Sequence, residues 1–165
     1  MKITDHTWGK GVYSQQWWDN NQLKFEITTK EGIMDTFTSW YRNGQKEREG
    51  IYKYGEPILY NSWNENGEIR VKDGNGKEIN WFDNGQKGYE GIFKDGKEDG
   101  KATKWYKNGQ MREETTFKDG ELDGKATGWY ENGQKSGEIT FKDGEKISAK
   151  CWDWNGNEED CDELE

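Results

Sequence analysis

The chain has almost no proline, cysteine or histidine and few aliphatic residues. Among its 165 residues there are one Pro, two Cys and one His. Two cysteines without histidine partners make neither a zinc site nor a disulfide framework. The content of large apolar residues is low for so charged a chain, with four Leu, ten Ile, two Val and six Phe. Such a composition is typical of disorder. Ten Trp and eight Tyr compensate, because each ring buries a large area. We therefore expect a folded domain with an aromatic core.

An excess of basic charge and a long hydrophobic run are also missing. The formal net charge is −9 and the sequence pI is about 4.8. A nucleic-acid or anionic-membrane surface would need a basic face, so the charge argues against both partners, whereas it permits a basic protein partner. No segment is apolar enough to span a bilayer, and the start MKITDHTWGK lacks the apolar core of a signal peptide. We expect a cytoplasmic protein.

The chain consists instead of one unit repeated in tandem. Residues 129–144 read WYENGQKSGEITFKDG, and close copies stand at 105–120 and 81–96. The tryptophan that opens each copy occurs at Trp17, Trp40, Trp63, Trp81, Trp105, Trp129 and Trp152. The spacing is 23 or 24 residues except for one interval of 18, from Trp63 to Trp81. Seven copies at such regular spacing predict a repeat protein.

The regular copies contain two turn signals, Asn-Gly and Asp-Gly, which are typical of tight hairpins. The first copy has Asn20-Asn21 and Glu31-Gly32 instead, the second closes with Tyr54-Gly55, and the seventh has no closing Asp-Gly. Short strands joined by tight turns pair antiparallel with their neighbours. The sequence thus predicts an all-β fold, an elongated single antiparallel sheet of about seven two-stranded repeats. The expected parts are a lead-in or capping strand (1–16), the repeats (17–157) and an acidic tail (158–165). The third copy is short, and Pro57, the only proline, stands just before its first strand.

Two turn registers are open at the Asn-Gly step. A two-residue type I′ turn at Asn132-Gly133 would place Tyr130 on the side of Ile139 and Phe141. A three-residue loop of residues 131–133 with a bulge moves the register by one and places Trp129 there. We favour the second register, because it groups the bulkiest apolar side chains.

The unit resembles the MORN-repeat variant that is widespread in bacteria, whose proteins are often described as YwqK-type antitoxins. The resemblance covers residues 17–157, and it is clearest at Trp105, Tyr106, Asn108, Gly109, Gln110, Phe117, Asp119 and Gly120. It implies an elongated antiparallel sheet and a protein-binding role.

For the residues that could be catalytic, a structural role is the better explanation. His6 stands alone near a terminus, and a general base needs partners that hold it in place. Asp95, Asp119 and Asp143 recur because aspartate caps its own turn. We therefore predict no catalytic residues, no metal site and no cofactor. Cys151 and Cys161 flank the last Asn-Gly turn, where a disulfide could staple the hairpin, but a cytoplasmic chain would keep them as free thiols.

The function that we expect is binding without catalysis. The leading hypothesis is an immunity or antitoxin protein that sterically neutralises a basic toxin or effector. The alternative is a structural or adaptor scaffold, with self-association through sheet edges. The candidate contacts are exposed aromatic and acidic residues: Tyr41, Tyr106, Tyr130, Asp153, Trp154, Glu158, Glu159 and Asp160.

Overall fold

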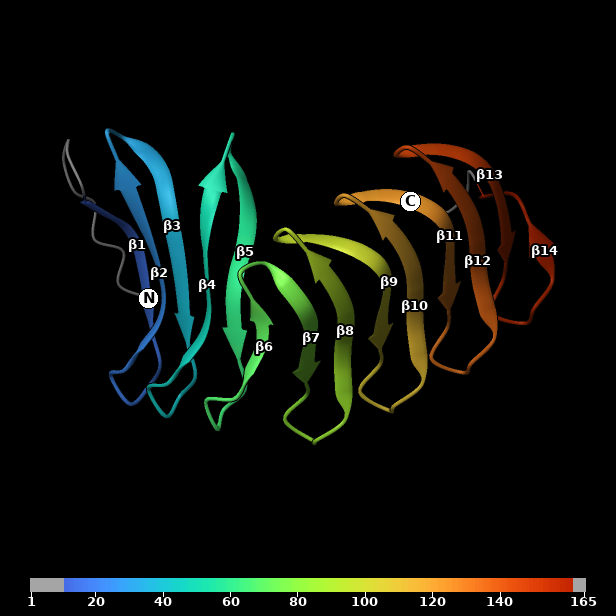
Figure 1. The fold of residues 1–165 in the computed structure, drawn as a ribbon. Coiled ribbons are helices and arrows are strands. Elements are labelled where there is room, and N and C mark those ends of the chain that lie inside the picture. The colour runs from blue at the N-terminus through green and yellow to red at the C-terminus, as the bar shows by residue number, and fades with distance from the viewer. Residues whose placement is uncertain (1–10, 162–165) are drawn as a thin grey trace. The chain divides into compact units, whose positions relative to one another are not determined.

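The computed structural model describes residues 11–161, in which the chain forms strands and turns and no α-helix (Figure 1). His6 and residues 162–165 of the predicted acidic tail lie outside this range. The strands are β1 (Gly11–Trp17), β2 (Leu23–Lys30), β3 (Ile33–Trp40), β4 (Lys46–Lys53), β5 (Glu56–Trp63), β6 (Ile69–Lys72), β7 (Asn75–Trp81), β8 (Lys87–Lys94), β9 (Lys97–Trp105), β10 (Met111–Lys118), β11 (Glu121–Trp129), β12 (Lys135–Lys142), β13 (Glu145–Trp152) and β14 (Glu158–Glu159).

The fourteen strands of the described residues form one open antiparallel sheet in chain order. This order follows from the short connections, because a tight turn places the strand that follows it antiparallel beside the strand that precedes it. The predicted all-β fold of tandem hairpins is confirmed. Among the described residues there is no helix long and apolar enough to cross a membrane.

The two turn signals produce two different turns. At Asp119-Gly120 both residues have positive φ, 52° and 88°, as a type I′ turn requires. At Asn132-Gly133 only the glycine has positive φ, 85°. There the Tyr130 N–H donates to the Gln134 carbonyl at 2.8 Å and the Gly133 N–H to the Tyr130 carbonyl at 2.9 Å. These bonds enclose the three-residue loop that we favoured, and the loop prediction is confirmed.

The prediction that Trp129 and Ile139 share a face is wrong. Ile139 pairs with Ala126, and Trp129 pairs with Lys135. Because side chains alternate along a strand, Trp129 lies on the face opposite that of Ala126 and Ile139. The cause is a second irregularity between Gly128 and Trp129, where one extra residue of β12 shifts the register back by one.

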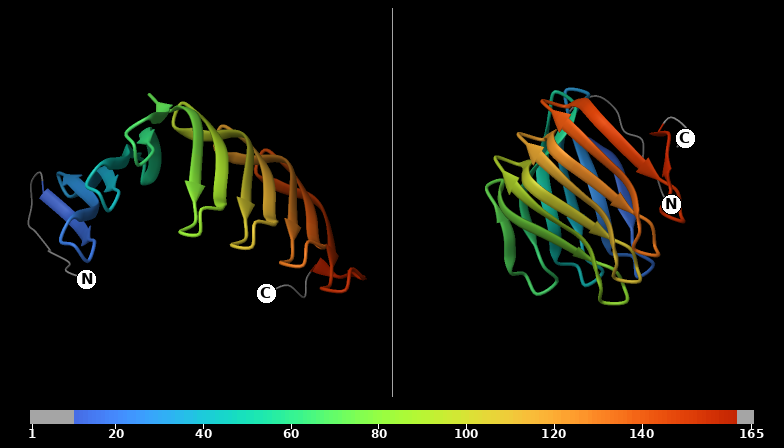
Figure 2. Two further views of the ribbon diagram at one scale, coloured as in Figure 1. Left: turned by 90° about the horizontal axis from the view of Figure 1, so that it is seen from below. Right: turned by 90° about the vertical axis from the view of Figure 1, so that its right-hand side faces the viewer.

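The chain divides into two compact units. In the described part of the chain, the N-terminal unit comprises residues 11–76 with 95–97, and the C-terminal unit comprises 77–94 and 98–161. In the C-terminal unit the hairpins from β8 to β13 lie side by side, with all Asn-Gly loops along one margin (Figure 2).

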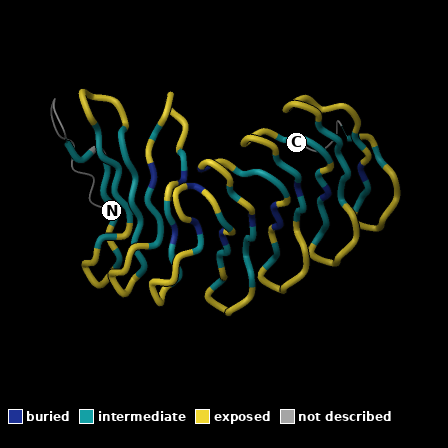
Figure 3. The backbone as a smooth tube through the Cα atoms, viewed as in Figure 1, coloured by how far each residue is buried: buried dark blue, intermediate teal, exposed yellow. Residues whose placement is uncertain are grey.

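The core is thin, and it is not aromatic as we predicted. The buried hydrophobic residues are Leu59, Val71, Ala102 and Cys151, joined by polar ones such as Ser62, Thr115 and Thr127. The described tryptophan side chains are half-buried or exposed. Most buried positions lie at mid-strand and most turn residues are exposed, apart from the buried turn glycines Gly74 and Gly96 (Figure 3). A single-layer sheet leaves both faces open to water, so a small residue between two strands is covered and a large ring is not.

Candidate functional site

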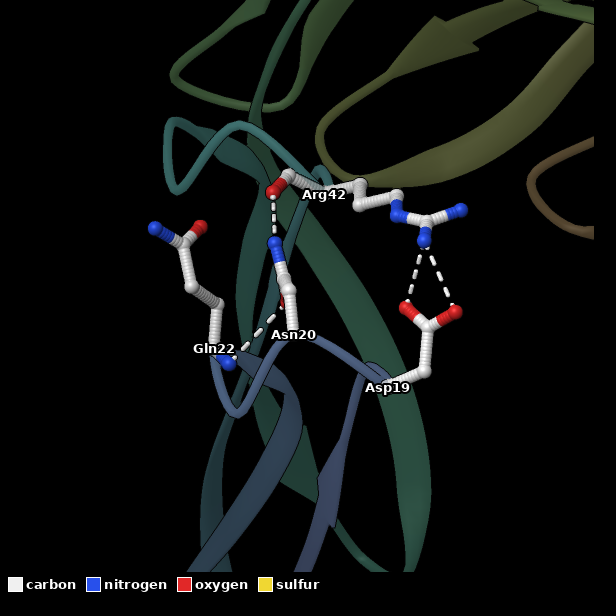
Figure 4. Close-up of polar contacts among 4 residues, drawn as sticks. All are labelled: Asp19, Asn20, Gln22 and Arg42. Carbon is white, nitrogen blue, oxygen red and sulfur yellow. Dashed lines mark hydrogen bonds and ion pairs between the residues drawn. The ribbon is translucent and has the colours of Figure 1, made fainter.

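The asparagine of each Asn-Gly-Gln motif joins its own loop to the next one, and so does Asn20 of the matching Asn20-Asn21-Gln22 in the first copy. In the first copy Asn20 Oδ1 accepts the N–H of Gln22 at 3.2 Å, and its Nδ2 donates to the Arg42 carbonyl at 3.0 Å (Figure 4). An ion pair between Asp19 and Arg42 at 2.7 Å adds to this contact. The same Nδ2 contact recurs at Asn43, Asn84, Asn108 and Asn132, each reaching a carbonyl 22 or 23 residues further on. We call this series the loop ladder; it explains the motif as a structural feature.

The aromatic residue after the opening tryptophan has a similar role. The hydroxyl groups of Tyr41, Tyr106 and Tyr130 donate to the carbonyls of Trp63, Trp129 and Trp152, at 2.8, 2.7 and 2.8 Å. All three tyrosines are half-buried. They were predicted as partner contacts, and the structure places their hydroxyls against the backbone of the following repeat.

Two loops are capped from within, a feature that our sequence reasoning missed. In the third copy Asn64 Oδ1 accepts the N–H groups of Asn66 and Glu68, at 3.0 and 2.8 Å. In the seventh copy Asp153 Oδ1 accepts those of Asn155 and Asn157, at 2.9 and 2.8 Å. These are the last Asn-Gly loops of their units. The signal in the sequence is Asn or Asp directly after the tryptophan, where the other copies have an aromatic ring.

Five of the predicted contact residues, together with Tyr130, gather at the end of the C-terminal unit. We call Trp154, Glu158, Glu159 and Asp160 the acidic edge. Trp154 is 52% exposed, and its ring lies 5.1 Å from that of Tyr130, tilted by 55°. Strand β14 brings Glu158 opposite Trp152 and Glu159 opposite Cys151. Tyr41 and Tyr106 belong to earlier loops and are not part of this cluster.

Negative charge is concentrated around this ring pair. Hydrogen bonds from Asn157, and then from Asn155, lower the pKa of Asp153 below its usual value. Burial, and after it the charges of Glu159 and Asp153, raise the pKa of Tyr130. The acidic edge therefore combines an exposed indole, which packs against the Tyr130 ring, with several neighbouring carboxylates.

A disulfide holds the acidic edge on the sheet. Cys151, which is 3% exposed, is bonded to Cys161, and their Cα atoms are 5.2 Å apart. The expectation of free thiols is thus wrong. The two cysteines are not directly opposite, since Cys151 pairs with Glu159. Only Asp160 separates β14 from Cys161, and the bond to Cys151 closes the last hairpin.

A second feature lies in the N-terminal unit beside the short third copy. Strand β6 pairs only with Ser62 and Trp63 of β5. Beyond them two Asp-Gly turns take the place of a strand: the Gly74 N–H donates to the Tyr60 carbonyl at 2.7 Å, and the Leu59 N–H donates to the Gly96 carbonyl at 3.1 Å. The result is a hollow of about 490 Å³ whose apolar lining includes Ile51, Ile58 and Tyr60. Pro57 lies inside β5 rather than before it.

Comparison with known families supports the repeat interpretation. Residues 36–54, 98–119 and 122–143 match the MORN repeat variant. The comparison with curated proteins finds no match. The described part of the chain holds no group of three or more His, Cys, Asp or Glu side chains placed to bind a metal. Repeats of this kind suggest a protein that binds other proteins or membranes.

Proposed function

We propose that this protein binds another protein without catalysing a reaction, as an immunity or antitoxin protein that neutralises a basic toxin sterically. The observation that carries the proposal is the acidic edge, where Trp154 is 52% exposed beside Glu158, Glu159 and Asp160. The bound toxin would have its own active site or substrate surface covered.

The acidic edge has the composition of a binding hot spot. Tryptophan and tyrosine dominate the energetics of protein interfaces, and they do so from positions that the fold holds rigidly. Trp154 is held in this way, because its ring rests on Tyr130 and the Cys151–Cys161 bond closes the segment that carries it. A ring fixed before binding loses little conformational entropy on contact with a partner.

The charge of the molecule favours a basic partner. The formal net charge is −9, and the carboxylates of the acidic edge add a local negative field around Trp154. Opposite potentials accelerate the encounter of two proteins and disfavour acidic partners. Nucleases and other toxins that act on anionic substrates carry basic surfaces, so they are the toxin class that fits best.

The test uses the protein encoded next to this one in its native genome. That neighbour is expressed from an inducible promoter, alone and together with this protein, and growth is recorded. We expect this protein to restore growth and to bind the purified neighbour. Trp154→Ala should weaken binding by about 30-fold or more. Trp81→Ala is the matched control, because Trp81 is also 52% exposed but lies away from the acidic edge.

Three outcomes would contradict the proposal. The first is a neighbour that does not harm growth, and the second is a rescue that Trp154→Ala and Trp81→Ala affect equally. The third is a mass that rises with concentration in light scattering when no other protein is present, which would favour a self-associating scaffold.

A further inference from the structure

The sequence contains seven Asn-Gly steps, and this dipeptide has a reactivity of its own. The backbone nitrogen of the glycine can attack the side-chain carbonyl carbon of the asparagine, because glycine has no side chain to hinder the approach. The attack requires the asparagine amide to rotate toward the following N–H. An amide held by hydrogen bonds on both its nitrogen and its oxygen resists this rotation.

Five of the seven amides are held on both atoms. Asn43, Asn84, Asn108 and Asn132 donate from Nδ2 to the next loop at 2.8–3.1 Å. Their Oδ1 atoms accept the N–H of the glutamine two residues on, at 2.9–3.1 Å. Asn75 donates to the Asp73 carbonyl at 2.8 Å and accepts the N–H of Asp95 at 3.3 Å.

Asn66 differs from these five. It is exposed, and among the residues that the structure describes, its side-chain amide has no hydrogen-bond partner on either atom. The reason is the internal cap of this loop, because Asn64 Oδ1 takes the N–H of Glu68 at 2.8 Å, the bond that the loop asparagine makes elsewhere. In the other internally capped loop, the Asn155 side chain interacts with the Asp153 carboxylate and helps to lower its pKa, an interaction that partly restrains Asn155.

The glycine nitrogen does not account for the difference. Gly67 N–H donates to the Asn64 carbonyl at 2.9 Å, and Gly44, Gly109 and Gly133 make the equivalent bond at 2.9 Å. The nucleophile is therefore restrained to the same degree in these loops. What distinguishes the third copy is the freedom of its asparagine side chain.

We propose that Asn66 is a site of spontaneous deamidation in the folded protein. The Gly67 nitrogen forms a bond to Cγ of Asn66 and loses its proton, and the amide group leaves as ammonia, which closes a five-membered succinimide. Water then adds to one of the two ring carbonyls and opens the ring, giving aspartate or isoaspartate. The only co-reactant is water, and the protein gains one negative charge.

The product changes this loop in two ways. A third carboxylate is added between Glu65 and Glu68, where like charges repel at short distance. Isoaspartate also inserts a methylene group into the backbone of a loop of only three residues, which disturbs the bonds from the Asn66 and Glu68 N–H groups to Asn64. The fraction of deamidated Asn66 would therefore increase with the age of the protein.

The test is to incubate the full-length protein at mildly alkaline pH and to map its peptides by mass spectrometry over time. Isoaspartate is identified by enzymatic methyl transfer to its carboxylate. We expect Asn66 to react first, about tenfold or more faster than Asn43, Asn108 and Asn132, because two hydrogen bonds hold each of those amides. Asn66→Gln should remove the earliest product and leave the others unchanged.

Unfolding provides the internal control. In concentrated denaturant the loop ladder is lost, and all seven Asn-Gly steps should react at similar rates within the same sample. Equal rates in the folded protein, or a folded-state order in which Asn108 or Asn132 precedes Asn66, would overturn the proposal.

Discussion

At the scale of single residues, the recurring side chains bond mainly to backbone outside their own repeat. Asn132 and Tyr130 reach the Trp154 and Trp152 carbonyls, each 22 residues away. The sequence shows that these residues recur, but recurrence does not distinguish a structural bond from an exposed binding residue. Trp154 can be recognised only by contrast, as a tryptophan at a loop position that is polar in the other copies.

Ion pairs on the sheet also repeat, and one of them gives a prediction about pH. The Glu138 carboxylate lies 2.7 Å from Lys125 Nζ and 2.8 Å from Lys135 Nζ. Hydrogen bonds from these two lysines lower the pKa of Glu138 from 4.5 to about 2. Since the folded-state pKa is the lower one, the stabilising contribution is complete above the unfolded value and is lost as the pH falls from 4.5 toward 2.

We therefore expect Glu138→Gln to reduce the steepness with which the free energy of unfolding falls across that acid range. Urea unfolding at a series of pH values measures the slope, and a carboxyl NMR titration measures the pKa directly. The double substitution Lys125→Met and Lys135→Met is the matched control, and it should return the pKa of Glu138 toward its usual value. A Glu138 pKa that stays the same when both lysines are replaced would contradict this account.

At the scale of elements, the turns were more predictable than the strand faces. Asp-Gly and Asn-Gly give a type I′ turn and a three-residue loop for local reasons, because positive φ favours Gly, Asn and Asp. The face of each strand depends on bulges, such as the one after Gly128. The position of a bulge depends on how one strand packs against both of its neighbours, so the sequence of one hairpin does not predict it.

Strand β14 contains only two residues, so we predict that the disulfide determines whether it forms. A strand of two residues at the edge of a sheet is not stable by itself. In Cys161→Ser, or after reduction, the amides of Glu158 and Glu159 should exchange hydrogen much faster, and global stability should fall by about 2–3 kcal/mol at most. Amides of β10 serve as the reference. If the Glu159 amide exchanged hydrogen at the same rate after reduction, β14 would not depend on the disulfide.

At the scale of the whole molecule, the sequence contains a sign of the division into two units. Asn64 and Asp153 cap the last Asn-Gly loop of each unit. In most of the other copies a Trp or Tyr at this position bonds to the following repeat. The short interval before Trp81 gives a second sign of the same boundary.

We predict that damage to one unit stays mainly within it, as expected for repeats that contact only their neighbours. Val71 is fully buried and its N–H donates to Ser62 Oγ at 3.2 Å. Val71→Ala should destabilise the N-terminal unit by about 2 kcal/mol. Native-state hydrogen exchange should show faster opening in β4 to β6 and little change in β10 to β12. A uniform loss of protection over the chain would show that the two units unfold together.

The sequence alone determined the number of repeats, the alternation of strands and tight turns, and the antiparallel order of the sheet. All three follow from interactions between residues close in the chain, where a turn dipeptide needs no distant partner. The tertiary structure decided which side chains share a face, which asparagines are held, how the cysteines pair and how the acidic edge is assembled. Each of these depends on a neighbouring strand or loop, and small shifts of register change which groups meet.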